Sequence, residues 1–225
     1  MPIMITEEMV LAKERENSTR FKELTARQKE IPSALEPEPN FPPECCCIKP
    51  IIYHNIREQV PVPQQRFMYA LCGLYMTLIG LILYNIIAAL VTLFFGGAVI
   101  HFGLSFLYLL GLPGAWIVWY FNVYSSVVKL SRIRQVFSIL GLFLAFAFDA
   151  WMAIGINGLG GCGWLITISA VKNLPCFIVL IIAAILWTLH GVAMFIMMGV
   201  FWKTSNVDLR SKQNAAAFNT HTVML

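Results

Sequence analysis

The residues able to carry acid–base, nucleophilic or metal chemistry are few and scattered in this sequence. The four histidines occupy a polar N-terminal region, two apolar stretches and the C-terminal end: His54, His101, His190 and His221. The sequence shows no Ser–His–acid set, phosphate-binding loop or zinc-type spacing of cysteines and histidines. We therefore expect a protein that is not an enzyme and that holds no catalytic residues, metal or cofactor.

Asp149 is the only acidic residue within the long apolar stretches. An ionisable side chain inside a membrane helix often marks an ion or proton path, so a small channel or transporter built around Asp149 is one functional hypothesis. Such a path needs several converging polar groups, and the sequence adds only Asn85 and His190. We favour the alternative, a structural Asp149 that is protonated or hydrogen-bonded to a neighbouring helix.

The cysteines allow one modification hypothesis. Cys45, Cys46 and Cys47 are contiguous and stand shortly before the first apolar stretch. Cysteines next to a membrane are the usual acceptors for S-acylation, and the sequence favours neither acylated nor unmodified thiols here. Cys162 and Cys176 could pair in an oxidising compartment, but we favour two unpaired thiols.

The most informative cluster lies between the second and third apolar stretches. Three aromatic residues come first and three basic residues follow: Trp119, Tyr120, Tyr124, Lys129, Arg132 and Arg134. Aromatic side chains of this kind favour the headgroup region, and each basic residue near an anionic leaflet contributes about 1 kcal/mol. We predict a segment that lies flat on the membrane and contacts lipid phosphates. The alternative is a short basic loop that only sets the orientation of the neighbouring helices.

Membrane-spanning helices are needed to position these residues. The chain is 58% hydrophobic and 12% charged, which is more apolar than a soluble domain of this size. A span requires about 20 apolar residues, and the uncharged run between Arg66 and Lys129 holds two of them. Two later apolar runs, separated from each other by Lys172, hold one span each. We predict an all-α integral membrane protein whose membrane domain, residues 67–202, contains spans at 67–95, 99–119, 135–156 and 174–202.

Polar regions flank the predicted membrane domain. Residues 1–31 are predicted to form a charged helix, and residues 32–66 a proline-rich linker followed by an interfacial segment. Residues 203–225 form a polar C-terminal tail. With four spans, all but one of the sixteen Lys and Arg fall on the side of the two tails, the exception being Lys172. The positive-inside rule then places both tails in the cytosol.

Several short motifs recur in a characteristic order around these spans. Phe41-Pro42-Pro43, before the first span, is similar to a Trp-Pro-Pro motif. The run His101–Ser105, at the start of the second span, is similar to the sequence Asp-Phe-Gly-Leu-Ser. Cys162-Gly163-Trp164 is similar to a Cys-Gly-Trp loop before the last span. Over roughly residues 41–218 the chain thus resembles the secretory carrier membrane protein (SCAMP) family. Trp119, Tyr120 and Tyr124 match that family's central segment, while the basic residues lie further downstream.

The resemblance implies a membrane-trafficking protein of post-Golgi and endosomal recycling carriers. It would act in vesicle transport and exocytosis through a cytosolic segment that contacts phosphoinositides, in Golgi-derived, endosomal or secretory vesicle membranes, with the plasma membrane as an alternative. The implied partners are the bilayer, anionic phospholipids and the trafficking or fusion machinery. A homo-oligomer is compatible with this interpretation, and nucleic acid is not expected. A purely structural scaffold that shapes or sorts membrane is a further interpretation.

Overall fold

The structure is a computed structural model that describes residues 13, 16–20, 23, 38–41, 49–50, 52–129 and 131–223, with side chains described as far as residue 205. The chain divides into two compact units, Met1–His54 and Asn55–Leu225.

In the first unit, the described residues between 13 and 23 are helical. The Glu16 carboxylate forms ion pairs with Lys13 and Arg20, with N–O distances of 3.2 and 3.4 Å. These side chains are exposed to solvent, where such pairs add little stability. The described part is thus a solvated charged helix; most of residues 1–31 lies outside the described residues.

The same unit contains a short antiparallel contact. Phe41 and Ile52 form an isolated β-bridge, and the Asn40 side chain bonds both the N–H and the carbonyl group of His54. Cys45, Cys46 and Cys47 lie outside the described residues, so their acylation stays a prediction.

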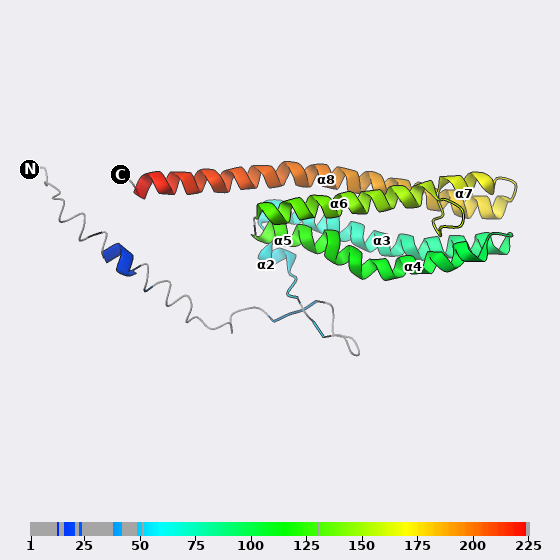
Figure 1. Ribbon diagram of the computed structural model, residues 1–225, viewed down its shortest axis with the longest axis horizontal. Helices are drawn as coiled ribbons and strands as arrows, with labels where there is room; N and C mark the ends of the chain where they lie inside the picture. Colours follow the sequence, from blue (N-terminus) through cyan, green and yellow to red (C-terminus); the bar gives the residue numbers. More distant parts are fainter. Residues whose placement is uncertain are drawn as a thin grey trace, which may run out of the picture. The chain divides into compact units, whose positions relative to one another are not determined.

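The second unit consists mainly of long helices that run side by side (Figure 1). Its elements are α2 (Ile56–Gln59), α3 (Val62–Phe94), α4 (Val99–Ala115), the π-helix η2 (Trp116–Phe121), α5 (Asn122–Lys129), α6 (Arg132–Ile154), α7 (Trp164–Ser169) and α8 (Leu174–Val223). Four helical stretches are long and apolar enough to cross a membrane: Val62–Phe94, Val99–Lys129, Arg132–Ile154 and Leu174–Ser205. Helices satisfy their own backbone hydrogen bonds, as the bilayer interior requires. The prediction of an all-α membrane protein with four spanning helices is therefore confirmed.

The first span begins earlier than predicted, at Val62 instead of residue 67. Pro61 and Pro63 stand at the start of α3, and proline fits the first turn of a helix because the N–H groups there have no intrahelical partner. In the sequence, these two prolines suggest that a helix is interrupted, but both are compatible with the start of α3.

The second span continues well past its predicted end at residue 119. α4, η2 and α5 follow one another without a break and end at Lys129, the first charged residue after Arg66. The change to π-helical geometry comes three residues after Pro113, which removes a backbone donor from α4. No flat segment joins the second span to the third in the described residues; α5 ends at Lys129 and α6 begins at Arg132.

The helices pack in a fixed order of neighbours. α6 packs against α8, α8 against α3, and α3 against α4. Within the most apolar stretch of each span, 39% of the last span and 17% of the second span is buried by the rest of the protein. The apolar part of the second span is therefore the least covered by the other helices.

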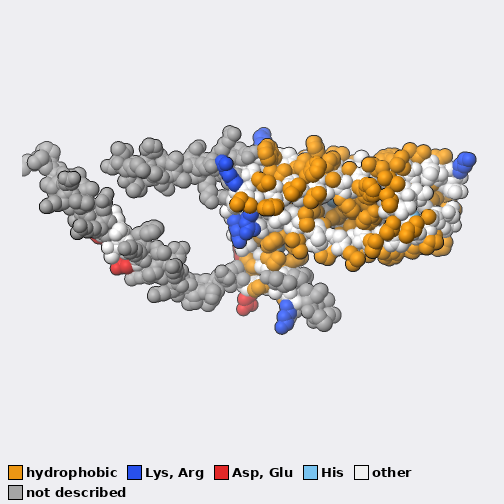
Figure 2. Space-filling model, in the orientation of Figure 1, with side chains coloured by type: hydrophobic (Ala, Val, Ile, Leu, Met, Phe, Trp, Pro, Cys, Tyr) orange, Lys and Arg blue, Asp and Glu red, His pale blue; other side chains and the backbone are white. Residues whose placement is uncertain are grey.

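The side surface of the second unit is apolar. Large side chains such as Leu110, Ile133 and Val136 are exposed along it. Figure 2 shows orange side chains along this surface and blue basic ones near its two ends. A surface of this size and composition would be unfavourable in water, and a bilayer would cover it.

The connection between α6 and α7 is folded against the helices. Asn85 of α3 donates to the carbonyl of Gly160 at 2.7 Å and accepts from the N–H of Cys162 at 2.8 Å. Asn85 stands roughly 14 Å from the end of α3 at about 1.5 Å per residue. The loop therefore lies alongside the bundle and does not project beyond it.

The second span holds the same loop from the other side. The Nδ1 atom of His101 accepts hydrogen bonds from the N–H groups of Gly158 and Gly160, both at 3.1 Å. The Tyr108 hydroxyl donates to the carbonyl of Leu159. Irregular backbone next to a membrane needs such partners, because an unsatisfied group there costs several kcal/mol.

Cys162 lies in this loop, and it and Cys176 are buried free thiols. Burial, with a smaller contribution from the Cys176 thiol, raises the pKa of the Cys162 thiol to about 12. The Cys162 thiol thus stays protonated and unreactive at neutral pH.

Candidate functional site

The basic residues of the predicted lipid-contact segment stand where α5 ends and α6 begins. Lys129, Arg132 and Arg134 are all exposed. No ion pair involves them within the described part of the chain. The charges are therefore free to meet an external anion.

The aromatic side chains of that segment are buried within the protein and are not exposed on its surface. Trp119, Tyr120 and Tyr124 are 3%, 0% and 3% exposed. The second span continues as a helix through all three positions, so their side chains pack against the neighbouring helices. They do not form a lipid-facing surface.

Tyr75 of α3 is the centre of the aromatic packing. Its ring lies 5.0 Å from Trp116, 5.8 Å from Trp119 and 6.1 Å from Tyr120. The Tyr75 hydroxyl donates to the carbonyl of Leu112 at 3.1 Å. Edge-to-face contacts of this kind add about 0.5–1.5 kcal/mol beyond the buried area. The cluster fixes η2 on α3 and so positions the basic residues that follow.

Tyr124 connects the second span to the short helix before the first. Its hydroxyl accepts a hydrogen bond from the N–H of Asn55 at 3.1 Å and donates to the Gln59 side chain. Asn55 is also the N-cap of α2. A buried tyrosine hydroxyl needs such partners, and here they attach α2 to α5.

Tyr124→Phe should loosen α2 while leaving the four spans in place. The change removes the hydroxyl but keeps the ring, and the lost hydrogen bonds are worth about 1 kcal/mol each. Hydrogen exchange of residues 55–60 in detergent-solubilised protein should accelerate. Tyr69→Phe, at a half-exposed position of α3, is the control; equal exchange in the two variants would contradict the role of the Tyr124 hydroxyl.

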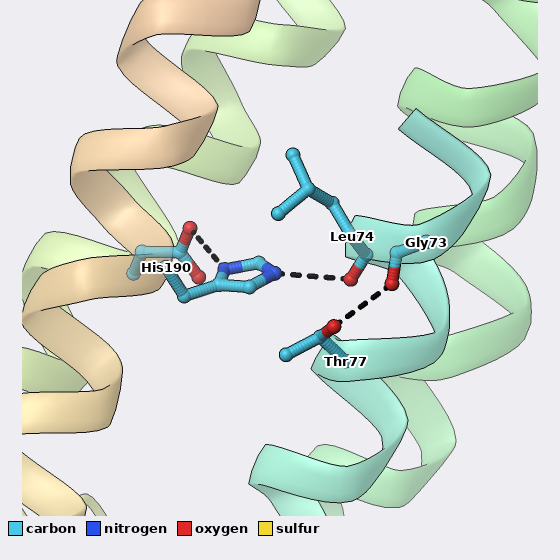
Figure 3. A network of polar contacts seen from close by, with 5 residues as sticks. Gly73, Leu74, Thr77 and His190 are labelled. Atoms are coloured by element: carbon cyan, nitrogen blue, oxygen red, sulfur yellow. Dashed lines mark hydrogen bonds and ion pairs between the residues drawn. The ribbon is translucent and has the colours of Figure 1, made fainter. Parts of the chain in front are cut away.

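Asp149 is buried and paired with a histidine from another span. The Asp149 Oδ2 atom lies 2.8 Å from Nδ1 of His190, and Nε2 of His190 lies 3.0 Å from the carbonyl oxygen of Leu74. Figure 3 shows the His190 ring directed from α8 toward the backbone of α3 at Leu74. A carbonyl can only accept, so Nε2 carries a proton and Nδ1 shares a second one with Asp149. The pair joins α6, α8 and α3.

Two hollows border this pair. A cavity of about 250 Å³ lies between the spans, with Asp149 and His190 in its wall, and a groove of about 430 Å³ also reaches Asp149. Among the described residues that line them, no other Asp, Glu, Lys, Arg or His is present. A transport path would need more polar groups, so the geometry favours the structural interpretation of Asp149.

Asp149→Asn should be nearly neutral, whereas Asp149→Ala should destabilise the protein by about 1–3 kcal/mol. The asparagine amide can donate to Nδ1 of His190 and preserve the bond, but alanine leaves this buried nitrogen without a partner. Thermal unfolding in detergent, followed by tryptophan fluorescence, compares the two variants. If Asp149→Asn were as damaging as Asp149→Ala and also abolished ion flux, the charge itself would be needed and the transport hypothesis would be favoured.

Three contacts were not predicted from the sequence. These are the His190–Asp149 bond, the attachment of Tyr124 to α2 and the Asn85–loop contact. Sequence signals were present for the first and third, because polar residues within apolar spans need partners. Nothing in the sequence indicated which residues would pair.

Comparison with known proteins supports one assignment. The family model described as SCAMP family matches residues 38–208. Secretory carrier-associated membrane protein 4 of Rattus norvegicus is 32% identical over 170 residues, 71% of each chain, and that of Pongo abelii is 31% identical over 169 residues, 72% of each chain. Secretory carrier-associated membrane protein 5 of Homo sapiens is 29% identical over 172 residues, 73% of this chain and 72% of the relative. No solved structure matches. The matched region contains all four spans with the contacts described above, and the chain belongs to the SCAMP family.

Proposed function

We propose that this membrane-trafficking family member acts in vesicle transport and exocytosis on post-Golgi and endosomal recycling carriers. The observation that carries the proposal is the family match over residues 38–208, combined with exposed basic side chains at one end of the spans. Both tails and this basic end would face the cytosol, and Lys129, Arg132 and Arg134 would contact phosphoinositides.

The structure changes how this contact would work. The aromatic residues are part of the protein interior, and the basic residues stand on helix ends, Lys129 at the end of α5 and Arg132 and Arg134 in the first turn of α6. A fixed position reduces the entropy that a flexible loop would lose on binding. Arg66 and Lys203 are also exposed, and each lies where α3 or α8 adjoins a polar tail. They would add to the positive potential at this basic end.

Replacing Lys129, Arg132 and Arg134 with Gln should weaken binding of the whole protein, embedded in neutral nanodiscs, to phosphoinositide vesicles. At about 1 kcal/mol for each charge, the loss is on the order of 100-fold. Vesicle flotation measures the binding. For the unchanged protein, binding should fall as salt rises, because screening acts over about 10 Å at 0.1 M ionic strength.

Two control variants separate this effect from a general loss of charge or structure. Arg132→Lys combined with Arg134→Lys preserves the charge and should bind nearly as well as the unchanged protein. Lys172→Gln removes a charge from the connection before α8 and should have no effect. Unchanged binding by the triple Gln variant would refute the lipid contact. If vesicle delivery in cells were defective while lipid binding stayed intact, trafficking would depend on protein partners instead.

A further inference from the structure

The apolar side surface of the membrane unit has nearly the same height on α3 and on α8. On α3, no Asp, Glu, Lys or Arg follows Arg66 as far as Phe94, and on α8 none lies between Leu174 and Lys203. At about 1.5 Å per residue, each of these two stretches is roughly 42–44 Å long. Large apolar side chains are exposed along both stretches, and we refer to this surface as the apolar band.

The exposed hydroxyl groups inside the apolar band do not interrupt it. Thr77 of α3 and Thr188 of α8 are exposed there, and each hydroxyl donates to a carbonyl of its own helix, at Gly73 and Ala184 respectively. A polar group can lie in hydrocarbon when its hydrogen bond is made within the protein. The apolar band is therefore compatible with hydrocarbon over its whole height.

Aromatic side chains stand near the ends of the apolar band. Tyr69 and Trp202 are exposed near the basic residues, and Phe94 is exposed at the opposite end. Tyrosine and tryptophan are favoured among the lipid headgroups, so the outermost turns can lie outside the hydrocarbon. With the turn at Tyr69 and the end at Phe94 left out, α3 still presents roughly 35 Å of apolar surface. The average tilt of about 20° lowers this height to about 33 Å.

The third span reaches a comparable height only with α7. The part of α6 from Arg134 to Ile154 is roughly 30 Å long, which equals the hydrocarbon thickness of an ordinary bilayer. Figure 1 shows α7 beyond this end of α6, and α7 packs against α8. Leu165 and Ile168 of α7 are exposed, so α7 continues the apolar surface past the end of α6.

We propose that the apolar band is matched to a thick bilayer, with a hydrocarbon core of about 33 Å or more, and favours thick membranes over thin ones. Hydrocarbon cores measure about 27 Å in the endoplasmic reticulum, about 30 Å on average and about 32–33 Å in the plasma membrane. In a thin bilayer, the outer turns would leave the hydrocarbon or the whole bundle would tilt further, and either change costs free energy for every Å of mismatch. This preference does not depend on the phosphoinositide contact proposed for the basic end.

The test uses the full chain in vesicles of phosphatidylcholines whose acyl chains differ in length, with hydrocarbon cores from about 25 to about 38 Å around the ordinary 30 Å. Brominated phosphatidylcholine of each length quenches tryptophans that contact lipid, such as the exposed Trp151 and Trp202. Competition with one unbrominated standard gives the relative binding constant of each length. This constant should rise roughly twofold to threefold between cores of about 27 and about 33 Å, and should peak at about 33 Å or above. A peak at about 30 Å or below, or no dependence on length, overturns the proposal.

Two double variants test whether the height of the apolar band sets this preference. Ile87→Glu with Ile178→Glu, both at exposed positions, shortens the band by roughly 6–10 Å, so the peak should move to a core of about 30 Å or less. Phe94→Glu with Leu174→Glu is the matched control, because it places the same charges at the existing end of the band, and its peak should stay. Glutamate has little influence on helix orientation. The same peak in both double variants would overturn the proposal; if the shortened variant does not fold, the series of chain lengths on the unchanged protein decides.

Discussion

Gly155→Ala should destabilise the membrane unit by about 2–5 kcal/mol. Gly155 ends α6 with φ +66, a left-handed conformation that L side chains rarely adopt. A Cβ atom there would also lie 2.0 Å from the backbone nitrogen of Gly163 and 2.3 Å from its Cα. A backbone neighbour cannot rotate away as a side chain can, so α6 and the loop would have to separate. Thermal unfolding in detergent, followed by tryptophan fluorescence, measures the loss.

Gly158→Ala separates the two causes of this effect. Gly158 has φ +86, but a Cβ atom there would meet nothing within 4 Å. The Gly158 variant should therefore show only the backbone cost, about 1–2 kcal/mol. Equal stability of the two alanine variants would mean that the close approach of Gly155 to Gly163 does not occur.

The four spans could be predicted because charge alone defines where they can lie. No charged residue stands between Arg66 and Lys129, and a bilayer accepts such a run only as helices. The ends of the helices were harder to predict. Proline at the start of α3 and the uncharged residues before Lys129 are both compatible with a longer helix, and the added part of the second span packs mainly against α6.

Composition alone could not predict whether the aromatic side chains would lie at the membrane interface or in the protein core. Tryptophan and tyrosine are favoured both at the membrane interface and in packed cores. Tyr120 and Tyr124 lie in the core because Tyr75 of α3 and Gln59 of α2 provide their partners. Both partners are distant in sequence, so a local pattern does not reveal them.

The Asp149–His190 pair shows the same limit. Each residue is conspicuous as a polar group in an apolar stretch, but the bond between them depends on the register of α6 against α8. Gly191 allows this register, since a Cβ atom there would lie 3.2 Å from Cβ of Asp149. The structure thus supplies the pairing, whereas the sequence supplies only the candidates.

Asn85→Leu should release the loop between α6 and α7 and cost about 2–6 kcal/mol. Leucine has a similar volume but no polar atoms, so the carbonyl of Gly160 and the N–H of Cys162 would both lose their side-chain partner. Two unsatisfied backbone groups next to the bilayer cannot be compensated by water without opening the structure. Thermal unfolding should show the loss of stability.

A second measurement shows whether the loop itself has opened. The buried Cys162 thiol should resist a maleimide reagent in the unchanged protein and react in the Asn85 variant, because an opened loop exposes the thiol and lowers its pKa toward the ordinary value. Asn122→Leu is the matched control: among the described residues, the Asn122 side chain donates only to the carbonyl of Val118, one turn earlier in the same span, so stability and Cys162 protection should stay close to those of the unchanged protein. Full protection of Cys162 in Asn85→Leu would show that the hydrogen bonds that His101 accepts from Gly158 and Gly160 hold the loop without Asn85.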